Sequence, residues 1–164
     1  VFGSANVTES EIKANDSRPG TVGNKSPYTA DYTINLGTQL DLPVTDTLDF
    51  VARADYRITG PTWFHTVQDE TVPTIFSGLI PVSQVSFLGA RFGDAKYDVA
   101  RRGTYGVLDL RAGLEGERWK ISVFANNALN KKYVNEVILA AEFGGSFISP
   151  GGRRLIGVEA GYKF

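Results

Sequence analysis

Apolar and polar residues alternate along several long stretches of the chain. In the first of these, the even positions from Tyr28 to Leu42 are apolar except for Thr38, while the odd positions from Thr29 to Asp41 are polar or glycine. A period of two residues is typical of a β-strand that has one apolar and one polar face. The pattern therefore predicts a long strand in this part of the chain.

The same alternation recurs in later stretches. Four further strands are predicted over residues 48–58, 108–115, 119–126 and 155–164, and the third of these could continue to Tyr133. A weaker, interrupted pattern over residues 1–14 predicts one more strand. The sequence thus predicts an all-β chain with five or six strands.

The connections between these strands alternate in length. Residues 43–47 and 115–118 form short turns, whereas residues 15–27, 60–103 and 135–152 form long connections. In an antiparallel up-and-down sheet, successive connections emerge at opposite ends, so all the long ones share one end. Transmembrane β-barrels have this asymmetry, with short periplasmic turns and long external loops.

Alternation alone leaves open whether the apolar face meets lipid or the core of a soluble, lipocalin-like barrel. Strand lengths of about ten residues suit a tilted membrane crossing. Aromatic residues near the strand ends are typical of the two interfacial girdles of a membrane barrel. These features favour a transmembrane β-barrel segment, with the girdle formed by Tyr28, Tyr32, Tyr56, Trp119, Tyr133, Tyr162 and Phe164.

Composition narrows the classes of function. The chain has 17 Lys and Arg against 18 Asp and Glu, which argues against a nucleic-acid binder that works by net charge. It has no Cys and one His, which excludes disulfides, cysteine nucleophiles and zinc sites with three histidines. The longest apolar run, residues 137–141, cannot form a transmembrane helix. Without a nucleophile elbow or a phosphate-binding glycine pattern, the sequence predicts neither an enzyme nor a bound cofactor.

Five or six strands are too few for a closed membrane barrel, for which eight is the bacterial minimum. An open sheet would leave unpaired backbone groups in lipid. The chain also begins without an initiator Met. We therefore expect residues 1–164 to be one portion of a larger barrel.

Several runs resemble the last strands of the barrel of TonB-dependent outer-membrane receptors. The run from Val123 to Tyr133 is similar to that family's penultimate strand and following turn, although an Ala separates the usual Asn-Leu pair. The end of the chain resembles the C-terminal strand that the barrel-assembly machinery recognises. The runs that carry the resemblance are Asn24–Thr29, Phe50–Tyr56, Leu108–Leu114, Val123–Tyr133 and Gly157–Phe164.

The resemblance implies a Gram-negative outer-membrane protein with a 22-stranded barrel around an N-terminal plug. Such a protein imports a scarce ligand, such as a ferric siderophore or cobalamin, with energy delivered through TonB. Its partners would be its own plug domain, TonB, the assembly machinery and outer-membrane lipid. A passive or structural barrel without a specific ligand remains an alternative.

Candidate ligand contacts lie in two places. Arg53 and Arg57, which flank Asp55 on a polar strand face, could attract an anionic ligand, or could form an ion-pair ladder along the lumen. Trp63 and His65 open the long connection 60–103 and could contact ligand at the external mouth, or Trp63 could belong to the outer girdle. Three basic pairs near the long-loop ends could bind lipopolysaccharide phosphates or an acidic ligand, or could be solvated flanks: Arg101-Arg102, Lys131-Lys132 and Arg153-Arg154.

Overall fold

The chain folds into an antiparallel sheet of six strands, which a computed structural model describes over residues 1–68, 100–140 and 145–164. In the order of the sheet, the strands are β1 (Phe2–Val7), β2 (Tyr32–Thr45), β3 (Leu48–Thr59), β7 (Tyr105–Gly116), β8 (Trp119–Asn126) and β11 (Leu155–Tyr162). Most of the connection 60–103, at residues 69–99, lies outside the described residues.

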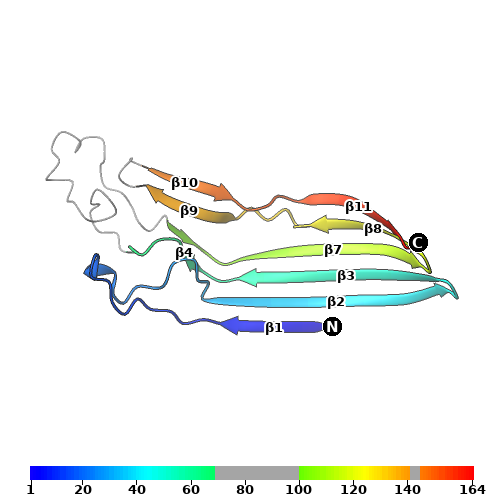
Figure 1. The fold of residues 1–164 in the computed structure, drawn as a ribbon, viewed down its shortest axis with the longest axis horizontal. Coiled ribbons are helices and arrows are strands. Elements are labelled where there is room, and N and C mark those ends of the chain that lie inside the picture. Colours follow the sequence, from blue (N-terminus) through cyan, green and yellow to red (C-terminus); the bar gives the residue numbers. More distant parts are fainter. Residues whose placement is uncertain (69–99, 141–144) are drawn as a thin grey trace.

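The six strands lie side by side in chain order (Figure 1). Two-residue turns join β2 to β3 and β7 to β8 at one end, which we call the turn end. The longer connections lie at the opposite end, which we call the loop end. The prediction of an up-and-down antiparallel segment with five or six strands is therefore confirmed.

Two small hairpins extend the structure at the loop end. β4 (Thr62–Trp63) pairs with β6 (Arg101–Arg102), and β9 (Val134–Ala140) pairs with β10 (Gly145–Pro150). The segment 135–152, predicted as a long connection, thus contains a hairpin that the sequence pattern did not predict. The apolar residues of β9 are consecutive, so this strand lacks the alternation that revealed the long ones.

Two strand boundaries also differ from the prediction. β2 begins at Tyr32 because Tyr28 has a φ of 61°, and Ala30 makes only an isolated bridge to Thr62. β8 ends at Asn126, since Asn127 has a φ of 49° and turns the chain. Tyr28 and Tyr133 therefore lie outside the long strands. A single 3₁₀ turn, η1 (Pro19–Thr21), lies in the connection before β2.

In all six strands, the pairing register places the apolar positions of neighbouring strands opposite one another. Residues paired across neighbouring strands point to the same side of a sheet. One side, the apolar face, therefore collects the apolar positions of every strand. A row across its middle consists of Leu40, Ala52, Ala112, Val123 and Val158.

Nothing in the described part of the chain covers the apolar face. Val123 is 55% exposed and Val158 is 67% exposed. The buried apolar side chains among the described residues are Phe64, Ala100 and Val137, and none of them belongs to the six-stranded sheet. No helix in the described residues is long and apolar enough to cross a membrane. The sheet therefore has an apolar side without a core of its own.

Candidate functional site

The opposite side, the polar face, carries paired charges and two aromatic rings that lie over glycines. The Phe2 ring occupies the space beside Gly37, where an added Cβ would lie 2.1 Å from it, and the Phe124 ring does the same beside Gly157. The Arg53 guanidinium lies 5.2 Å from the Phe2 ring centroid, within the range of a cation–π contact. Glycine in these strands thus makes room for a ring on which an arginine rests.

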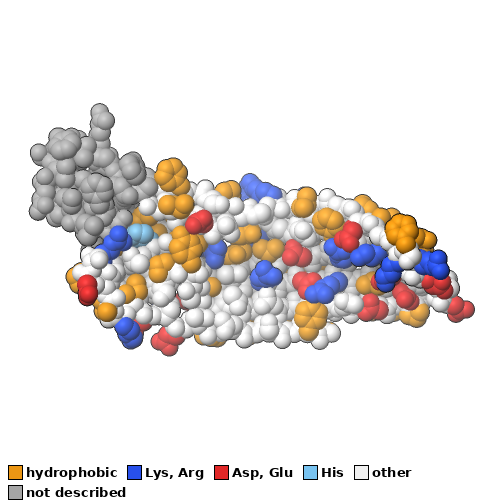
Figure 2. All heavy atoms as spheres, viewed as in Figure 1, with side chains coloured by type: hydrophobic (Ala, Val, Ile, Leu, Met, Phe, Trp, Pro, Cys, Tyr) orange, Lys and Arg blue, Asp and Glu red, His pale blue; other side chains and the backbone are white. Residues whose placement is uncertain are grey.

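A second arginine repeats this arrangement. Arg111 lies 5.7 Å from the Phe124 ring centroid and donates to Glu159 at 2.7 Å. Lys120 approaches the same carboxylate at 3.2 Å. In Figure 2, blue and red side chains lie next to one another along this part of the molecule. Since these pairs are exposed, each adds little stability.

Arg53 and Arg57, the two predicted ligand contacts on β3, differ in their partners. Arg53 makes a two-pronged ion pair with Asp55, with N···O distances of 2.7 and 2.9 Å. Arg57 donates through Nε to Asn35 Oδ1 at 3.2 Å, and no carboxylate of the described residues forms an ion pair with it. Arg57 is therefore the better placed of the two to meet an added anion.

Arg57 borders two hollows on the polar face. One, of about 360 Å³, is lined also by Phe2, Asn35, Arg53 and Asp109. The other, of about 310 Å³, lies nearer the loop end and is lined also by Tyr105, Asn127, Tyr133 and Arg153. Asp109 borders both hollows, but its carboxylate already accepts a hydrogen bond from the backbone N–H of Asn127 at 2.7 Å. Arg57 thus projects a positive charge between two open spaces.

A half-buried arginine joins three segments at the loop end. Arg102 lies between the rings of Phe64 and Tyr105, with centroid distances of 5.3 and 4.7 Å. Its guanidinium donates to the carbonyl oxygens of Val134 and Asn135 at 3.1 and 3.3 Å, and to Thr62 Oγ1 at 2.9 Å. This side chain therefore links β4, β6 and β9. The sequence pattern, in which Arg102 is one member of a basic pair, did not predict this link.

Trp63 and His65 lie at the loop end, apart from Arg53 and Arg57. The Trp63 ring contacts Arg101 at 5.5 Å, and His65 Nδ1 accepts the backbone N–H of Val67 at 3.0 Å. Neither residue borders the hollows that Arg57 borders. The structure thus separates the four predicted ligand contacts into a strand pair and a loop-end pair.

The predicted girdle residues occupy different positions. Trp119 and Tyr162 are paired on the apolar face at the turn end, where Phe164 makes an edge contact with Tyr162 at 5.4 Å. Tyr32 and Tyr56 lie on the apolar face towards the loop end. Two aromatic groups thus lie near opposite ends of the apolar face, as an interfacial girdle requires.

The other two predicted girdle residues make local contacts. Tyr133 stacks on Tyr105 at 4.2 Å, and Tyr105 lies on the polar face. The Tyr28 ring packs against Phe64, and its hydroxyl donates to Glu136 at 3.0 Å. Desolvation of the Tyr28 hydroxyl raises its pKa, and the hydrogen bond to the Glu136 carboxylate raises it further. Both rings thus fasten loop-end segments to one another.

The part of the chain that the structure describes contains no group of three His, Asp or Glu side chains placed to hold a metal ion.

Comparison with known proteins supports the fold. No protein-family profile matches the sequence, and neither does any curated protein. Among solved structures, the chain is similar to the ferric yersiniabactin uptake receptor FyuA from Yersinia pestis, with a TM-score of 0.63 and 18% identity. The match covers 88% of this chain and 18% of the receptor chain. The chain therefore has the fold of a fragment of a TonB-dependent receptor barrel, as its sequence runs predicted.

Proposed function

We propose that this chain forms wall and lining of a Gram-negative outer-membrane β-barrel that takes up a scarce ligand in a TonB-dependent manner. One observation carries the proposal. Across all six strands, the apolar side chains lie on one face of the sheet, which nothing in the described residues covers, while charged residues and glycines lie on the other. A lipid-facing sheet has this property, because lipid replaces the missing core. The fold of a siderophore uptake receptor supports a transport role.

In this proposal, the apolar face contacts outer-membrane lipid and the polar face lines the lumen. Further strands complete the barrel, a plug domain of the same protein packs inside it, and TonB supplies the energy. The assembly machinery recognises β11. The ligand is a compound too scarce or too large for passive entry, such as a ferric siderophore or cobalamin.

A soluble lipocalin-like binder is disfavoured by the burial pattern. Such a barrel encloses its apolar side chains, whereas Leu36, Val123 and Ile156 are 51%, 55% and 67% exposed. A passive barrel without a specific ligand has the same two faces, so uptake kinetics must distinguish it from a receptor.

The first test is uptake by cells that carry the full-length protein. Radiolabelled ferric complexes of catecholate, hydroxamate and phenolate siderophores, and labelled cobalamin, serve as probes. We expect saturable uptake of one probe that stops when the proton gradient is dissipated. Uptake of every probe that is neither saturable nor energy-dependent would identify a passive barrel instead.

A second test concerns the lumen. Arg57→Gln removes the positive charge that borders both hollows, so we expect uptake of an anionic probe to need about tenfold more ligand for half-saturation, the effect of about 1.4 kcal/mol. Arg118→Gln, which removes a charge from the turn after β7, is the matched control. Equal uptake by the two variants would remove Arg57 from the ligand path without affecting the proposal of transport.

A further inference from the structure

The hollow near the loop end of the polar face is bordered by two arginines from distant parts of the chain. It has a volume of about 310 Å³, and we call it the loop-end hollow. Arg57 comes from β3, and Arg153 comes from the segment that precedes β11. In the sheet, β7 and β8 lie between these two strands. The two cations therefore border the hollow from different sides.

Both arginines have N–H groups that the described residues do not use. Arg57 donates through Nε to Asn35, and its guanidinium makes no other hydrogen bond within the described part of the chain. The Arg153 guanidinium forms neither a hydrogen bond nor an ion pair with any described residue. The hollow is thus bordered by two planar cations that can still donate hydrogen bonds to a ligand.

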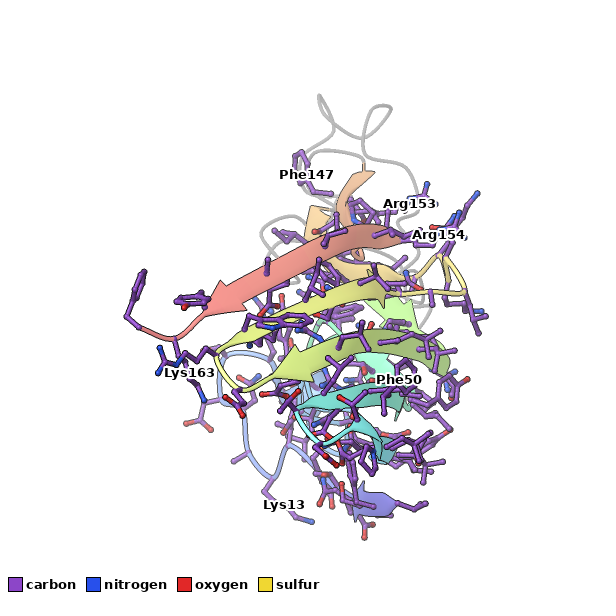
Figure 3. All side chains as sticks on the ribbon, turned by 90° about the vertical axis from the view of Figure 1, so that its right-hand side faces the viewer. Lys13, Phe50, Phe147, Arg153, Arg154 and Lys163 are labelled. Carbon is purple, nitrogen blue, oxygen red and sulfur yellow. The ribbon has the colours of Figure 1, made fainter. Side chains whose placement is uncertain are left out.

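The neighbouring Arg154 has the same charge but a different position. Arg153 and Arg154 both lie at the beginning of β11 (Figure 3), and both are exposed. Only Arg153 lines the loop-end hollow. Arg154 is therefore a matched control for the position of a charge at this end of the sheet.

The backbone around the loop-end hollow is held by Asn127, which is only 4% exposed. Its amide nitrogen donates to the carbonyl oxygen of Gly152, the residue before Arg153, at 2.8 Å. Its backbone N–H donates to the Asp109 carboxylate at 2.7 Å. These bonds join β7, the end of β8 and the segment before β11. Little backbone order therefore has to be gained when a ligand binds.

The aromatic rings beside the hollow are already in contact with other parts of the protein. Tyr105 stacks on Tyr133 at 4.2 Å and contacts the Arg102 guanidinium at 4.7 Å. The Tyr133 ring occupies the space beside Gly151, where an added Cβ would lie 2.2 Å from it. Neither tyrosine hydroxyl makes a hydrogen bond within the described residues. The hollow therefore favours a ligand group that binds through hydrogen bonds over one that binds by stacking.

The charges of the lining favour an anion. Arg57, Arg153 and Asp109 are its charged side chains, which leaves one positive charge in excess. A carboxylate suits the two arginines, because its two oxygens can accept parallel hydrogen bonds from one guanidinium. Pockets for whole ligands range from about 300 to about 1,000 Å³. The loop-end hollow is at the lower limit of that range, so it suits one end of a larger ligand.

We propose that the loop-end hollow is the subsite for a carboxylate-bearing end of the transported ligand, with Arg57 and Arg153 as its donors. This inference rests on the proposed function and narrows its substrate class. The ligand is an anionic metal complex with exposed carboxylates, rather than a neutral hydroxamate complex or cobalamin. Arg153 is then a residue that determines specificity, although it lies outside the long strands.

The first test is binding to the full-length protein in detergent micelles, measured by isothermal titration calorimetry. The probes are ferric citrate, which retains uncoordinated carboxylates, and N-acetyl ferrioxamine B, a neutral hydroxamate complex. We expect the Kd of ferric citrate to be about tenfold smaller or less, because only this probe supplies charge to the two guanidinium groups. Equal binding of the two probes, tighter binding of the neutral probe, or no binding of ferric citrate would overturn the inference.

Competition distinguishes a carboxylate from a phosphate subsite, since both anions match a guanidinium. We expect succinate to displace ferric citrate at lower concentrations than inorganic phosphate does. Displacement by phosphate but not by succinate would identify a phosphate subsite and overturn the inference.

Single variants locate the contact. Arg57→Gln and Arg153→Gln should each raise the Kd of ferric citrate about tenfold, whereas Arg154→Gln should change it by less than about threefold. Heat-modified gel mobility checks that each variant is folded. Equal losses in Arg153→Gln and Arg154→Gln would show attraction by net charge alone and contradict a subsite in the hollow.

The outcomes for this inference and for the proposed function can be separated. Saturable, energy-dependent uptake of a neutral complex, without binding of ferric citrate, would reject the carboxylate subsite alone. Absence of energy-dependent uptake of every probe by wild-type cells would reject the proposed function, whatever the affinity for ferric citrate.

Discussion

At the scale of single residues, Asn127 ends β8 and fixes the conformation of the turn after it. It adopts a φ of 49°, which asparagine tolerates better than most residues. Its buried amide makes three hydrogen bonds to backbone atoms of two segments, and its backbone N–H donates to Asp109. The preceding Asn126 is exposed, and no side-chain hydrogen bond of it is found in the described structure.

We expect Asn127→Ala to lower the free energy of unfolding by about 2–4 kcal/mol, because three hydrogen bonds disappear and the carbonyls of Lys131 and Gly152 lose their donor. Urea titration of the full-length protein in lipid vesicles measures the change. Asn126→Ala, the control in the same strand end, should change it by less than about 0.5 kcal/mol. A similar loss in both variants would mean that the turn does not depend on the Asn127 amide.

The sequence could not distinguish residues whose neighbours come from distant segments. Arg101 and Arg102 are identical side chains in adjacent positions, yet Arg101 is exposed beside Trp63, while Arg102 is half-buried between Phe64 and Tyr105. Arg53 and Arg57 lie on the predicted face. Their partners differ, because Arg53 pairs with the Asp55 carboxylate whereas Arg57 donates to the Asn35 amide across the strand pair. The sequence pattern along a strand predicts the face on which a side chain lies, whereas its ion-pair and hydrogen-bond partners depend on the geometry of neighbouring side chains.

At the scale of elements, alternation predicted the long strands because each has one apolar and one polar face. It failed for β9 and β10, where Val137 is buried while Ile138 and Phe147 are exposed, so that apolar residues occupy both sides. These short strands are placed by contacts with other segments at the loop end. Arg102 is the main contact of this kind, since it carries hydrogen bonds from β6 to β4 and β9.

We expect Arg102→Met to keep the bulk between the two rings but to release β9 from β4 and β6. The loss of charged hydrogen bonds should lower the local opening free energy by about 2–4 kcal/mol. Amide hydrogen exchange of the β9 peptides in the full-length protein measures this change. Arg101→Met, the control, removes the same charge but none of those hydrogen bonds. We expect faster exchange of the β9 peptides in Arg102→Met and unchanged exchange in Arg101→Met. Unchanged exchange in both variants would show that β9 is held by other contacts.

At the scale of the whole molecule, the sheet is stabilised by what covers its apolar face. In the proposed membrane setting, lipid supplies that cover, and a charge placed in the middle of the face has to leave water. We expect Val123→Arg to lower the free energy of unfolding from vesicles by about 2–4 kcal/mol, the cost of arginine near the bilayer midplane. Ser122→Arg, at the next position on the polar face, should cost much less. Equal costs at the two positions would contradict the assignment of the apolar face to lipid.

The consecutive order of the six strands also has a consequence for how the sheet assembles. Among these six strands, each pairs with the one before it, so the sheet can grow at one edge as the polypeptide arrives. Three of the pairings, β1 with β2, β3 with β7 and β8 with β11, close a long intervening segment, and the entropic cost of such a closure rises slowly with length. A strand that joins one residue out of step would turn all its apolar side chains to the polar face. A strand that has just joined the edge is paired on one side only, so an out-of-step strand can detach before the next strand pairs with it.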